Sequence, residues 1–426
     1  MLLPQAFATL NAAAAPAFPR GLLAIARGLY GGGGDITLWS DMASQSTIDL
    51  LGRLLAFDTT SRNSNLALIA EVEAYLDGLG VPHERVTDVC GEKANLYATI
   101  GPADRPGIVL SGHTDVVPVD GQTWSSDPFA LLRRDGRIYG RGACDMKGFL
   151  AVCLALAPEM VKADLKIPIH FAFSYDEEVG CLGVRGLLEA LAARPVKPLG
   201  CIVGEPTDMQ VVIGHKAKRS LAAVARGAGG HSSRAPEFVN AVEHAARLVT
   251  AVTEIGARLA ASGGRDELYD VPFSTAHVGV FHGGTALNIV PDEATLEFEF
   301  RVLPEEDAEA LVAEARGVAA GIEAEMKARD PRTSLEVRIK SEFPGLSTDP
   351  SADIVTLAKR LAGRNDHAKV AYGTEAGLFV EMAGIPTVIC GPGSIGEAHK
   401  PDEFVTEAQL AACEAFVRRL IAHCSA

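Results

Sequence analysis

The chain alternates between stretches in which apolar residues recur every three or four positions and short, uninterrupted apolar runs. The first pattern is typical of amphipathic helices and the second of buried strands. Helices are predicted over residues 46–57, 65–80, 146–161, 351–363 and 407–423. Strands are predicted over residues 95–101, 107–117, 167–178, 199–205 and 385–393. Because this alternation favours a parallel sheet covered on both faces, we expect an α/β domain with a mixed, mostly parallel sheet flanked by helices.

A different order of elements lies between residues 215 and 338. A strand, a helix, two strands, a second long helix and a last strand are predicted there. This β-α-β-β-α-β order suggests a small antiparallel sheet with helices on one face. We therefore expect 215–338 to be an α+β domain inserted into a larger domain, which is formed by 42–214 with 339–426. A length of 426 residues also favours more than one domain.

Residues 1–41 differ in composition from the rest of the chain. They contain an alanine-rich stretch, four consecutive glycines at 31–34, and no acidic residue before Asp35. An organellar transit peptide has such an acid-poor composition. A leader that does not belong to the native protein is the alternative, and it is the one we favour. On either interpretation, 1–41 is expected to be a poorly ordered leader without function.

Composition narrows the class of protein. A net charge of -15 and a pI near 5.2 argue against a nucleic-acid partner, because phosphate binding needs a basic face. The eight cysteines form no CxxC pair, and several lie in apolar runs, which favours reduced, buried thiols in a cytoplasmic enzyme. No apolar run approaches the ~20 residues that a membrane-spanning helix needs. We therefore expect a cytoplasmic enzyme with neither a nucleic-acid nor a membrane partner.

Side chains that can bind metals stand where the predicted strands end. His113 and Asp115 end one strand, the acidic run 176–178 ends another, and Glu205 ends a third. In sheets of this class, ligands gather beyond the carboxyl ends of the strands, so these side chains are expected in one site. Taken singly, each has an ordinary alternative: the acidic run could be a solvated loop, and the His-x-Asp pair a surface hydrogen bond.

Two more candidate ligands are Asp145, just before an apolar helix, and His399, after a glycine-rich loop. Taken alone, Asp145 would be read as an ordinary helix N-cap. Together with Glu178 and the groups above, however, they supply one shared carboxylate plus one imidazole and one carboxylate for each of two divalent ions. Imidazole and oxygen ligands without thiolate suit zinc best, with cobalt or manganese as alternatives. Glu177 is left over to act as a base.

The polar motifs resemble, in order and spacing, those of the zinc-dependent aminoacylase, carboxypeptidase and deacetylase family. The motifs that carry the resemblance are SGHTDVVP, GRGACDMKG, SYDEEVG, GEPT and AHKPDEF, with GGTALNIVPDEATLEFEFR in the insert. The resemblance extends over about residues 46–424. Within the family, YGTEAGLF and CGPGSIGEAHKPDEF are most similar to the bacterial members that deacetylate N2-acetyl-L-ornithine.

The resemblance implies a role for each candidate ligand. Asp145 would bridge two ions, His113 and Glu205 would bind one of them, and Glu178 and His399 would bind the other. The resemblance also implies a cis peptide bond after Asp145.

Further roles follow from the same resemblance. Glu177 would be the general base, and Asp115 would orient His113 through its second ring nitrogen. His231 would reach across a dimer interface to stabilise the oxyanion, although without the family it would be read as a turn histidine. Asn288 and Arg301 would hold the substrate.

Two assignments go beyond the motif or have a competing interpretation. A surface salt bridge from Arg301 to Glu297 or Glu299 is an equally good interpretation of the sequence alone. Our own hypothesis is that Glu375 pairs with the terminal ammonium of an ornithine substrate.

The expected function is hydrolysis of N2-acetyl-L-ornithine to L-ornithine and acetate in arginine biosynthesis. Residues 42–214 with 339–426 would form the catalytic, metal-binding domain, and the insert 215–338 would be a lid or dimerisation domain through which a homodimer forms. A metal-bound hydroxide would be the nucleophile, assisted by Glu177. The alternatives are a succinyl-diaminopimelate desuccinylase and a broader N-acyl-amino-acid hydrolase. A non-catalytic module on a decayed scaffold is disfavoured because every expected position is filled. A dinucleotide-binding protein is disfavoured because no GxGxxG opens a helix after the first strand.

Overall fold

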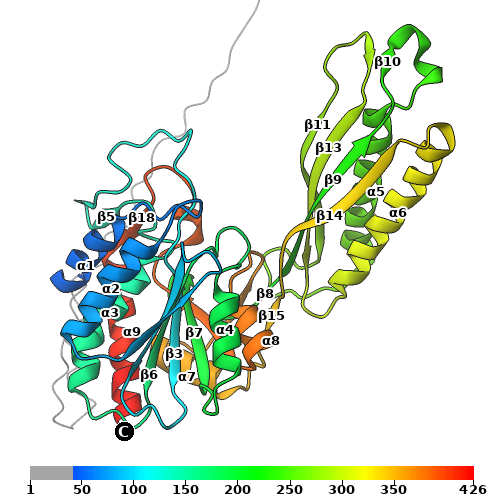
Figure 1. Ribbon diagram of the computed structural model, residues 1–426. Coiled ribbons are helices and arrows are strands. Elements are labelled where there is room, and N and C mark those ends of the chain that lie inside the picture. Colours follow the sequence, from blue (N-terminus) through cyan, green and yellow to red (C-terminus); the bar gives the residue numbers. More distant parts are fainter. Residues whose placement is uncertain (1–41) are drawn as a thin grey trace, which may run out of the picture. The chain divides into compact units, whose positions relative to one another are not determined.

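The largest sheet has a parallel centre and antiparallel flanks (Figure 1). The structure, a computed structural model, describes residues 42–426, and the leader predicted at 1–41 lies outside the described residues. Nine strands form this sheet in the order β1-β2-β6-β3-β7-β17-β8-β15, with β16 also pairing with β8. They are β1 (His83–Thr87), β2 (Ala94–Ile100), β3 (Ile108–His113), β6 (Ile169–Ser174), β7 (Gly200–Pro206), β8 (Val212–His215), β15 (Leu346–Ser347), β16 (Ala368–Val370) and β17 (Thr387–Gly391). The four strands β6, β3, β7 and β17 are mutually parallel.

Helices cover both faces of this sheet. They are α1 (Gln45–Leu55), α2 (Leu66–Gly78), α3 (Lys147–Lys162), α4 (Val184–Ala192), α7 (Asp353–Ala362), α8 (Ala376–Ala383) and α9 (Glu407–Ser425). Successive residues of a strand point to opposite faces. Leu110 of β3 accordingly packs in the apolar cluster of α1, α2, α3, α7 and α9, whereas Val109 packs in the cluster of α4 and α8. The expected mixed, helix-flanked α/β sheet is confirmed, and its parallel part is the centre.

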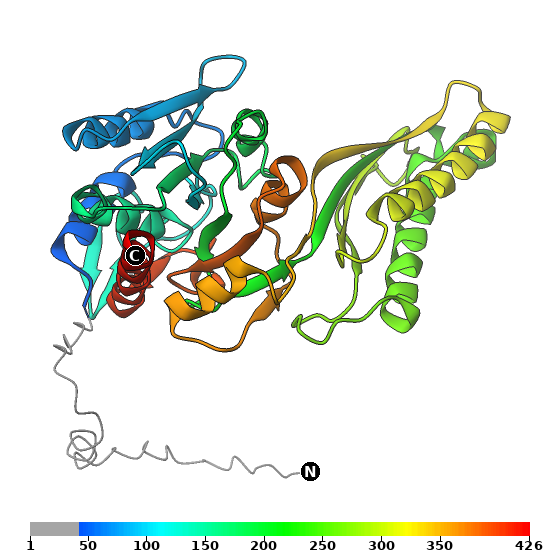
Figure 2. The ribbon, with the colours of Figure 1, turned by 90° about the horizontal axis from the view of Figure 1, so that it is seen from below.

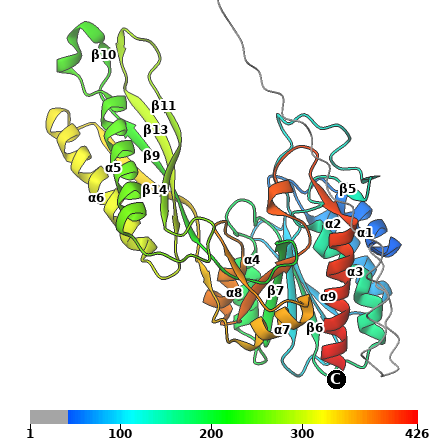
Figure 3. The ribbon, with the colours of Figure 1, turned by 180° about the vertical axis from the view of Figure 1, so that it is seen from behind.

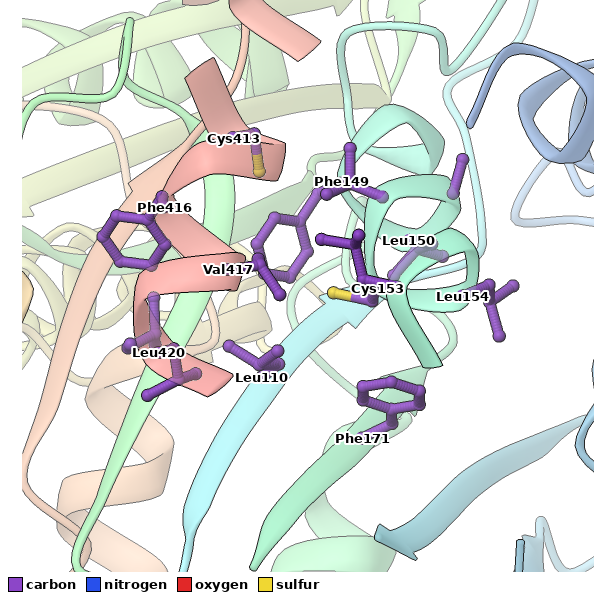
Figure 4. Packing of buried hydrophobic residues seen from close by; sticks show 14 of the residues in the cluster. Leu110, Phe149, Leu150, Cys153, Leu154, Phe171, Cys413, Phe416, Val417 and Leu420 are labelled. Carbon is purple, nitrogen blue, oxygen red and sulfur yellow. The ribbon is translucent and has the colours of Figure 1, made fainter. Parts of the chain in front are cut away.

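Helices α3 and α9 lie side by side on one face of the sheet (Figure 3). Phe149 and Cys153 of α3 face Val417 and Leu420 of α9 above Leu110 (Figure 4). A Cβ built on Gly204 would lie 2.0 Å from the Phe149 ring, so β7 can approach α3 this closely only with glycine there. The core packing thereby sets the position of the strand residue that follows Gly204.

A separate four-stranded antiparallel sheet has the order β11-β13-β9-β14. Its elements are β9 (Ala217–Arg226), α5 (Ala241–Ser262), β11 (Thr275–Gly283), β13 (Glu293–Val302), α6 (Ala308–Arg329) and β14 (Ser334–Phe343). Both helices lie on one face of the sheet (Figure 2), where they share an apolar cluster with alternate residues of β13. The expected β-α-β-β-α-β order is confirmed. β14 runs past residue 338 to Phe343, because it continues to pair with β9 as far as Lys218.

Two small sheets were not predicted. One joins β10 (Gly230–His231) to β12 (Ile289–Val290). The other joins β4 (Leu132–Arg134), β5 (Arg137–Tyr139) and β18 (Phe404–Thr406). The second sheet brings the chain around residues 399–404 beside the chain around residues 139–145, although the two are far apart in sequence.

The cysteines are all free, and Cys90 alone among them is exposed. This agrees with the expectation of reduced, buried thiols. None of the helices in the described part of the chain is both long enough and apolar enough to cross a membrane.

Two buried histidines predict that stability falls in mild acid. Burial lowers the pKa of His170, which stacks on Tyr97, to about 4, and it lowers the pKa of His215 to about 4. Between about pH 6.5 and pH 4 the unfolded chain therefore binds protons that the folded chain does not, and stability is lost as the pH falls through this window. We expect each histidine to make the free energy of unfolding ~2 kcal/mol smaller at pH 5 than at pH 7. Urea unfolding of His170→Gln should show a smaller loss than wild type. The exposed His282→Gln variant is the control, and equal losses in wild type and His170→Gln would contradict the prediction.

Candidate metal centre

One buried carboxylate lies between two imidazoles. Asp145 Oδ1 is 3.0 Å from His113 Nε2, and Asp145 Oδ2 is 3.1 Å from His399 Nε2. Each imidazole also faces a glutamate: His113 Nε2 is 3.8 Å from Glu205 Oε1, and His399 Nε2 is 3.2 Å from the Glu178 carboxylate. The structure thus brings all five candidate ligands together, in two sets that share Asp145.

The fold explains why these residues meet. His113 is the last residue of β3, Glu178 follows β6, and Glu205 lies near the end of β7. Because the three strands are parallel neighbours, their carboxyl ends share one edge of the sheet. Asp145 comes from the segment before α3, and its peptide bond to Met146 is cis, as the resemblance implied. His399 follows a short 3₁₀ helix (Ile395–Glu397).

Buried acids crowd this edge. Burial, reinforced by the neighbouring carboxylates, raises the pKa of Glu178 to about 7 and that of Glu177 to about 8. Burial and the nearby Asp145 carboxylate also raise the pKa of Glu205 well above its usual range. Hydrogen bonds to Asp145 and Glu178 raise the pKa of His399 to about 10. Carboxylates that repel one another in this way are stabilised by a cation among them.

The donor geometry fits divalent ions. Ligand atoms of His113, Asp145 and Glu178 lie within 4.8 Å of one another, and so do those of His113, Glu177 and Glu205. The donors are imidazole nitrogen and carboxylate oxygen, which zinc accepts. Position alone does not separate Glu177 from the candidate ligands.

Asp115 does not contact His113 in the way that we expected. His113 Nδ1 lies 2.8 Å from the main-chain oxygen of Asp115 and 3.6 Å from its carboxylate. The carboxylate instead accepts hydrogen bonds from the N–H groups of Glu177 and Glu178, at 3.1 and 3.3 Å, and from Ser61 Oγ at 2.7 Å. Asp115 lies beyond the end of β3, so its side chain is not fixed by strand alternation. The carbonyl orients the imidazole, and the carboxylate holds the turn that carries the two glutamates.

Several residues around the acidic turn were not identified from the sequence. Asp176, the first acid of the run, pairs with Lys93 at 2.5 Å. The Cys181 thiol donates to Glu177 Oε1 at 3.3 Å. Cys181 lies only four residues after Glu177, but Lys93 and Ser61 are far away in sequence, and no local pattern connects them to the turn.

His231 and Asn288 lie next to each other in the insert. His231 pairs with Ile289 across the short β10–β12 ladder, and the N–H of Ser232 donates to the Asn288 carbonyl at 3.1 Å. His231 is exposed, and its Nδ1 accepts from the Ser233 N–H at 3.2 Å. In the neutral ring the proton is therefore on Nε2. Within the described residues, neither side chain contacts the five candidate ligands.

Arg301 and Glu375 both have protein partners. Arg301 Nε donates to Glu299 at 3.0 Å, which is the salt bridge that the sequence offered as an alternative. Glu375 is buried, and its two oxygens accept from Ser111 and Ser174, each at 2.7 Å. These serines stand on β3 and β6, close to the carboxyl ends of those strands. That either residue contacts a substrate stays a prediction.

The comparison with known families decides the class of protein. Residues 109–423 match Peptidase family M20/M25/M40. The chain belongs to this family. It is 34% identical to an acetylornithine deacetylase from Myxococcus xanthus over 378 residues, which cover 88% of this chain and 96% of the relative. It is 33% identical over 372 residues to an acetylornithine deacetylase from Proteus mirabilis (strain HI4320), with 86% and 92% covered.

Solved structures of the M20 family share the fold. A metallo-carboxypeptidase of this family from Sulfolobus solfataricus superimposes with a TM-score of 0.74 at 20% identity, covering 90% of this chain and all of the other. A Bacillus subtilis protein described as a dinuclear metal-binding peptidase from the M20 family superimposes with a TM-score of 0.62 at 18% identity, covering 88% of this chain and 97% of the other. The chain is an M20-family hydrolase of amide bonds, and the cluster at Asp145 supports metal dependence.

The two sets of ligands predict two separable zinc sites. In His399→Ala only one of the sets loses its imidazole, because His113 still faces the other oxygen of Asp145. We expect wild type to bind two zinc ions per chain and His399→Ala to keep one, with the affinity of the other at least ~100-fold weaker. Equilibrium dialysis of the chelator-stripped protein followed by elemental analysis measures both. His282→Ala, on exposed β11, should behave as wild type. Two tightly bound ions in His399→Ala would show that this imidazole is not a ligand.

Proposed function

We propose that this M20-family chain hydrolyses N2-acetyl-L-ornithine to L-ornithine and acetate, in the cytoplasm, as a step of arginine biosynthesis. The observation that carries the proposal is the buried Asp145 carboxylate held between two imidazoles, each beside a further glutamate. The choice of substrate is supported by relatives named acetylornithine deacetylase that match most of the chain at 33–34% identity.

We assign two divalent ions to this cluster, with zinc preferred and cobalt as the alternative. Asp145 would belong to both ligand sets, with His113 and Glu205 in one set and Glu178 and His399 in the other. When bound, the ions polarise the acyl carbonyl and make a water molecule more acidic. The main-chain carbonyl of Asp115 orients His113 so that Nε2 faces the cluster.

Glu177 is the general base in this mechanism. Its carboxylate takes a proton from the attacking water as the oxygen bonds to the acetyl carbon. It then delivers that proton to the ornithine nitrogen as the C–N bond breaks, and acetate leaves with the water oxygen. The Cys181 thiol and the Asp115 carboxylate hold Glu177, through its side chain and its main-chain N–H respectively. These bonds therefore hold Glu177 in one position when it accepts the proton.

The insert supplies the remaining groups in the proposal. His231 donates through Nε2 to the developing oxyanion, in the active site of a second copy of the chain, and Asn288 lies beside it. A homodimer through the insert is supported by the edge strand β11, which exposes Val280 and Phe281 at 37% and 39%. An unpaired apolar edge of this kind favours pairing with another chain.

Arg301 and Glu375 are proposed to bind the two ends of ornithine. The guanidinium suits the α-carboxylate, for which it would exchange its bond to Glu299. A desuccinylase acting on succinyl-diaminopimelate would need a second cationic side chain for the distal carboxylate. We do not assign one from the sequence. A broader N-acyl-amino-acid hydrolase is the remaining alternative.

The base predicts a specific kinetic change. Replacing Glu177 with glutamine keeps the size of the side chain but removes the proton acceptor, so kcat for acetylornithine should fall ~10²- to 10⁴-fold while KM changes little. Bound zinc should stay at the wild-type level, which separates a loss of the base from a loss of a ligand. Zinc loss in Glu177→Gln would instead assign Glu177 to the ligand set.

A panel of acyl amino acids tests the substrate. The zinc-loaded wild type should give a higher kcat/KM for N2-acetyl-L-ornithine than for N-succinyl-L,L-diaminopimelate or N-acetyl-L-methionine. A preference for the succinylated compound would overturn the proposed substrate but not the metal-dependent hydrolysis.

Glu375 can be tested with a substrate that lacks the terminal ammonium. N2-acetyl-L-norvaline has the carbon chain of acetylornithine but no terminal ammonium. Glu375→Gln should raise KM for acetylornithine ~10-fold, equivalent to ~1.4 kcal/mol, and leave KM for acetylnorvaline unchanged. Parallel changes for both substrates would mean that Glu375 acts on the strands through Ser111 and Ser174 rather than on the substrate.

A further inference from the structure

A buried guanidinium beside the metal centre donates short hydrogen bonds to two side chains and a longer one, of 3.5 Å, to the Lys400 carbonyl. Arg141 is 1% exposed. Its Nη1 donates to Glu403 Oε2 at 2.6 Å, and its Nη2 donates to Gln122 Oε1 at 2.6 Å. An arginine that forms only a structural ion pair commonly directs two N–H groups at one carboxylate. Arg141 instead joins two different segments of the chain.

The first path of hydrogen bonds from Arg141 runs through Glu403 and ends on the main chain of Asp145. Glu403, also 1% exposed, accepts hydrogen bonds through Oε1 from the N–H of Cys144 at 2.9 Å and from the N–H of Asp145 at 3.1 Å. The other oxygen of the same carboxylate accepts from Arg141. Glu403 therefore transmits the position of the guanidinium to the peptide group that carries the shared carboxylate.

The second path of hydrogen bonds from Arg141 runs through Gln122 and ends on the main chain of His399. Gln122 Nε2 donates to the His399 carbonyl at 3.0 Å. Gln122 Oε1 accepts from Trp124 Nε1 at 3.0 Å as well as from Arg141, so the orientation of the amide is fixed at both ends.

The backbone of His399 needs such support. It has φ of 62°, a left-handed conformation that is uncommon for residues other than glycine. The His399 side chain is half exposed, whereas those of Asp145 and Glu178 are only 6% and 8% exposed. Packing around the imidazole is therefore incomplete, and the main chain has to fix its direction.

We propose that Arg141 is a positioning residue which, through Glu403 and Gln122, sets the separation of Asp145 and His399 and thereby the zinc affinity of the site that they share. The inference rests on the proposed function in one respect, since it takes these two residues as ligands. Hydrogen-bonding partners of metal ligands typically change metal affinity by 10- to 100-fold.

The chain offers a control for the ion pair, with an arginine side chain that is 38% exposed. Arg133 on β4 donates to both oxygens of Glu407, at 2.8 and 2.7 Å, and the Glu407 side chain is 5% exposed. This pair is also an arginine with a buried carboxylate near the start of α9. None of its hydrogen bonds reaches a candidate metal ligand, so replacing Arg133 tests the effect of losing an ion pair alone.

Two variants and a control distinguish the contributions of the two hydrogen-bond paths. Arg141→Lys keeps the charge, but one ammonium cannot take the places of two guanidinium nitrogens. Gln122→Met keeps the length of the side chain and removes its bonds to His399, Arg141 and Trp124, while the bonds from Arg141 to Glu403 and from the Asp145 N–H to Glu403 stay. Arg133→Lys is the control. Zinc binding to each chelator-stripped protein is measured by competition with a chromophoric chelator, and the thermal unfolding of each metal-free protein is recorded alongside it.

Gln122→Met should weaken the binding of one zinc ion ~10-fold and leave the affinity for the other within ~2-fold of wild type, because His399 loses its bond to Gln122 whereas Asp145 keeps its bond to Glu403. Arg141→Lys should weaken the binding of both ions, since Asp145 also loses support. Arg133→Lys should bind zinc as wild type does, even where its metal-free form unfolds at a lower temperature.

Wild-type affinity for both ions in Arg141→Lys and Gln122→Met would overturn the inference and leave the proposed function intact. An equal loss of zinc affinity in Arg133→Lys and in Arg141→Lys would also overturn the inference, because the effect would then be one of general stability. If Arg141→Lys does not fold, Gln122→Met decides the question alone. A wild-type protein that binds neither zinc nor cobalt would instead overturn the proposed function, and the inference with it.

Discussion

The sharing of the Asp145 carboxylate between two imidazoles is the constraint on which the rest of the site depends. Each oxygen faces a different histidine, and the two histidines come from segments that lie 286 residues apart in the chain (399 minus 113). A carboxylate can serve two partners in this way only if its own backbone and both rings are held from outside the cluster. The surrounding fold meets this need with strand ends on one side and a network of side chains on the other.

The parallel centre of the sheet supplies the first kind of support. His113, Glu178 and Glu205 reach one edge because β3, β6 and β7 run in the same direction. Buried serines beneath this edge bind Glu375, and the Asp115 carboxylate binds the turn after β6. Glu375 and Asp115 are thus held by neutral donors, which are serine hydroxyls for the first and main-chain N–H groups for the second.

The sequence predicted the long elements and the grouping of the ligands, because both follow from regular patterns. Short apolar runs, such as residues 108–110 in β3 and 201–203 in β7, mark buried strands, and polar residues after them mark one edge of a sheet. The strands β4, β5 and β18 have three residues each and are too short to show a period. The orientation of Asp115 could not be predicted either, because it lies outside the strand. The bonds of Arg141 to Glu403 and of Ser61 to Asp115 join residues 262 and 54 positions apart, and no local pattern carries such information.

The close approach of β7 to α3 at Gly204 has a consequence for how this protein can vary. The same glycine that allows the Phe149 ring to fill the interior also precedes Glu205. The Phe149 ring thus packs directly against the backbone of the residue that precedes Glu205. A larger or smaller ring at position 149 would displace Glu205 as well as its apolar neighbours, so the volume of the interior and the geometry of the polar edge must change together.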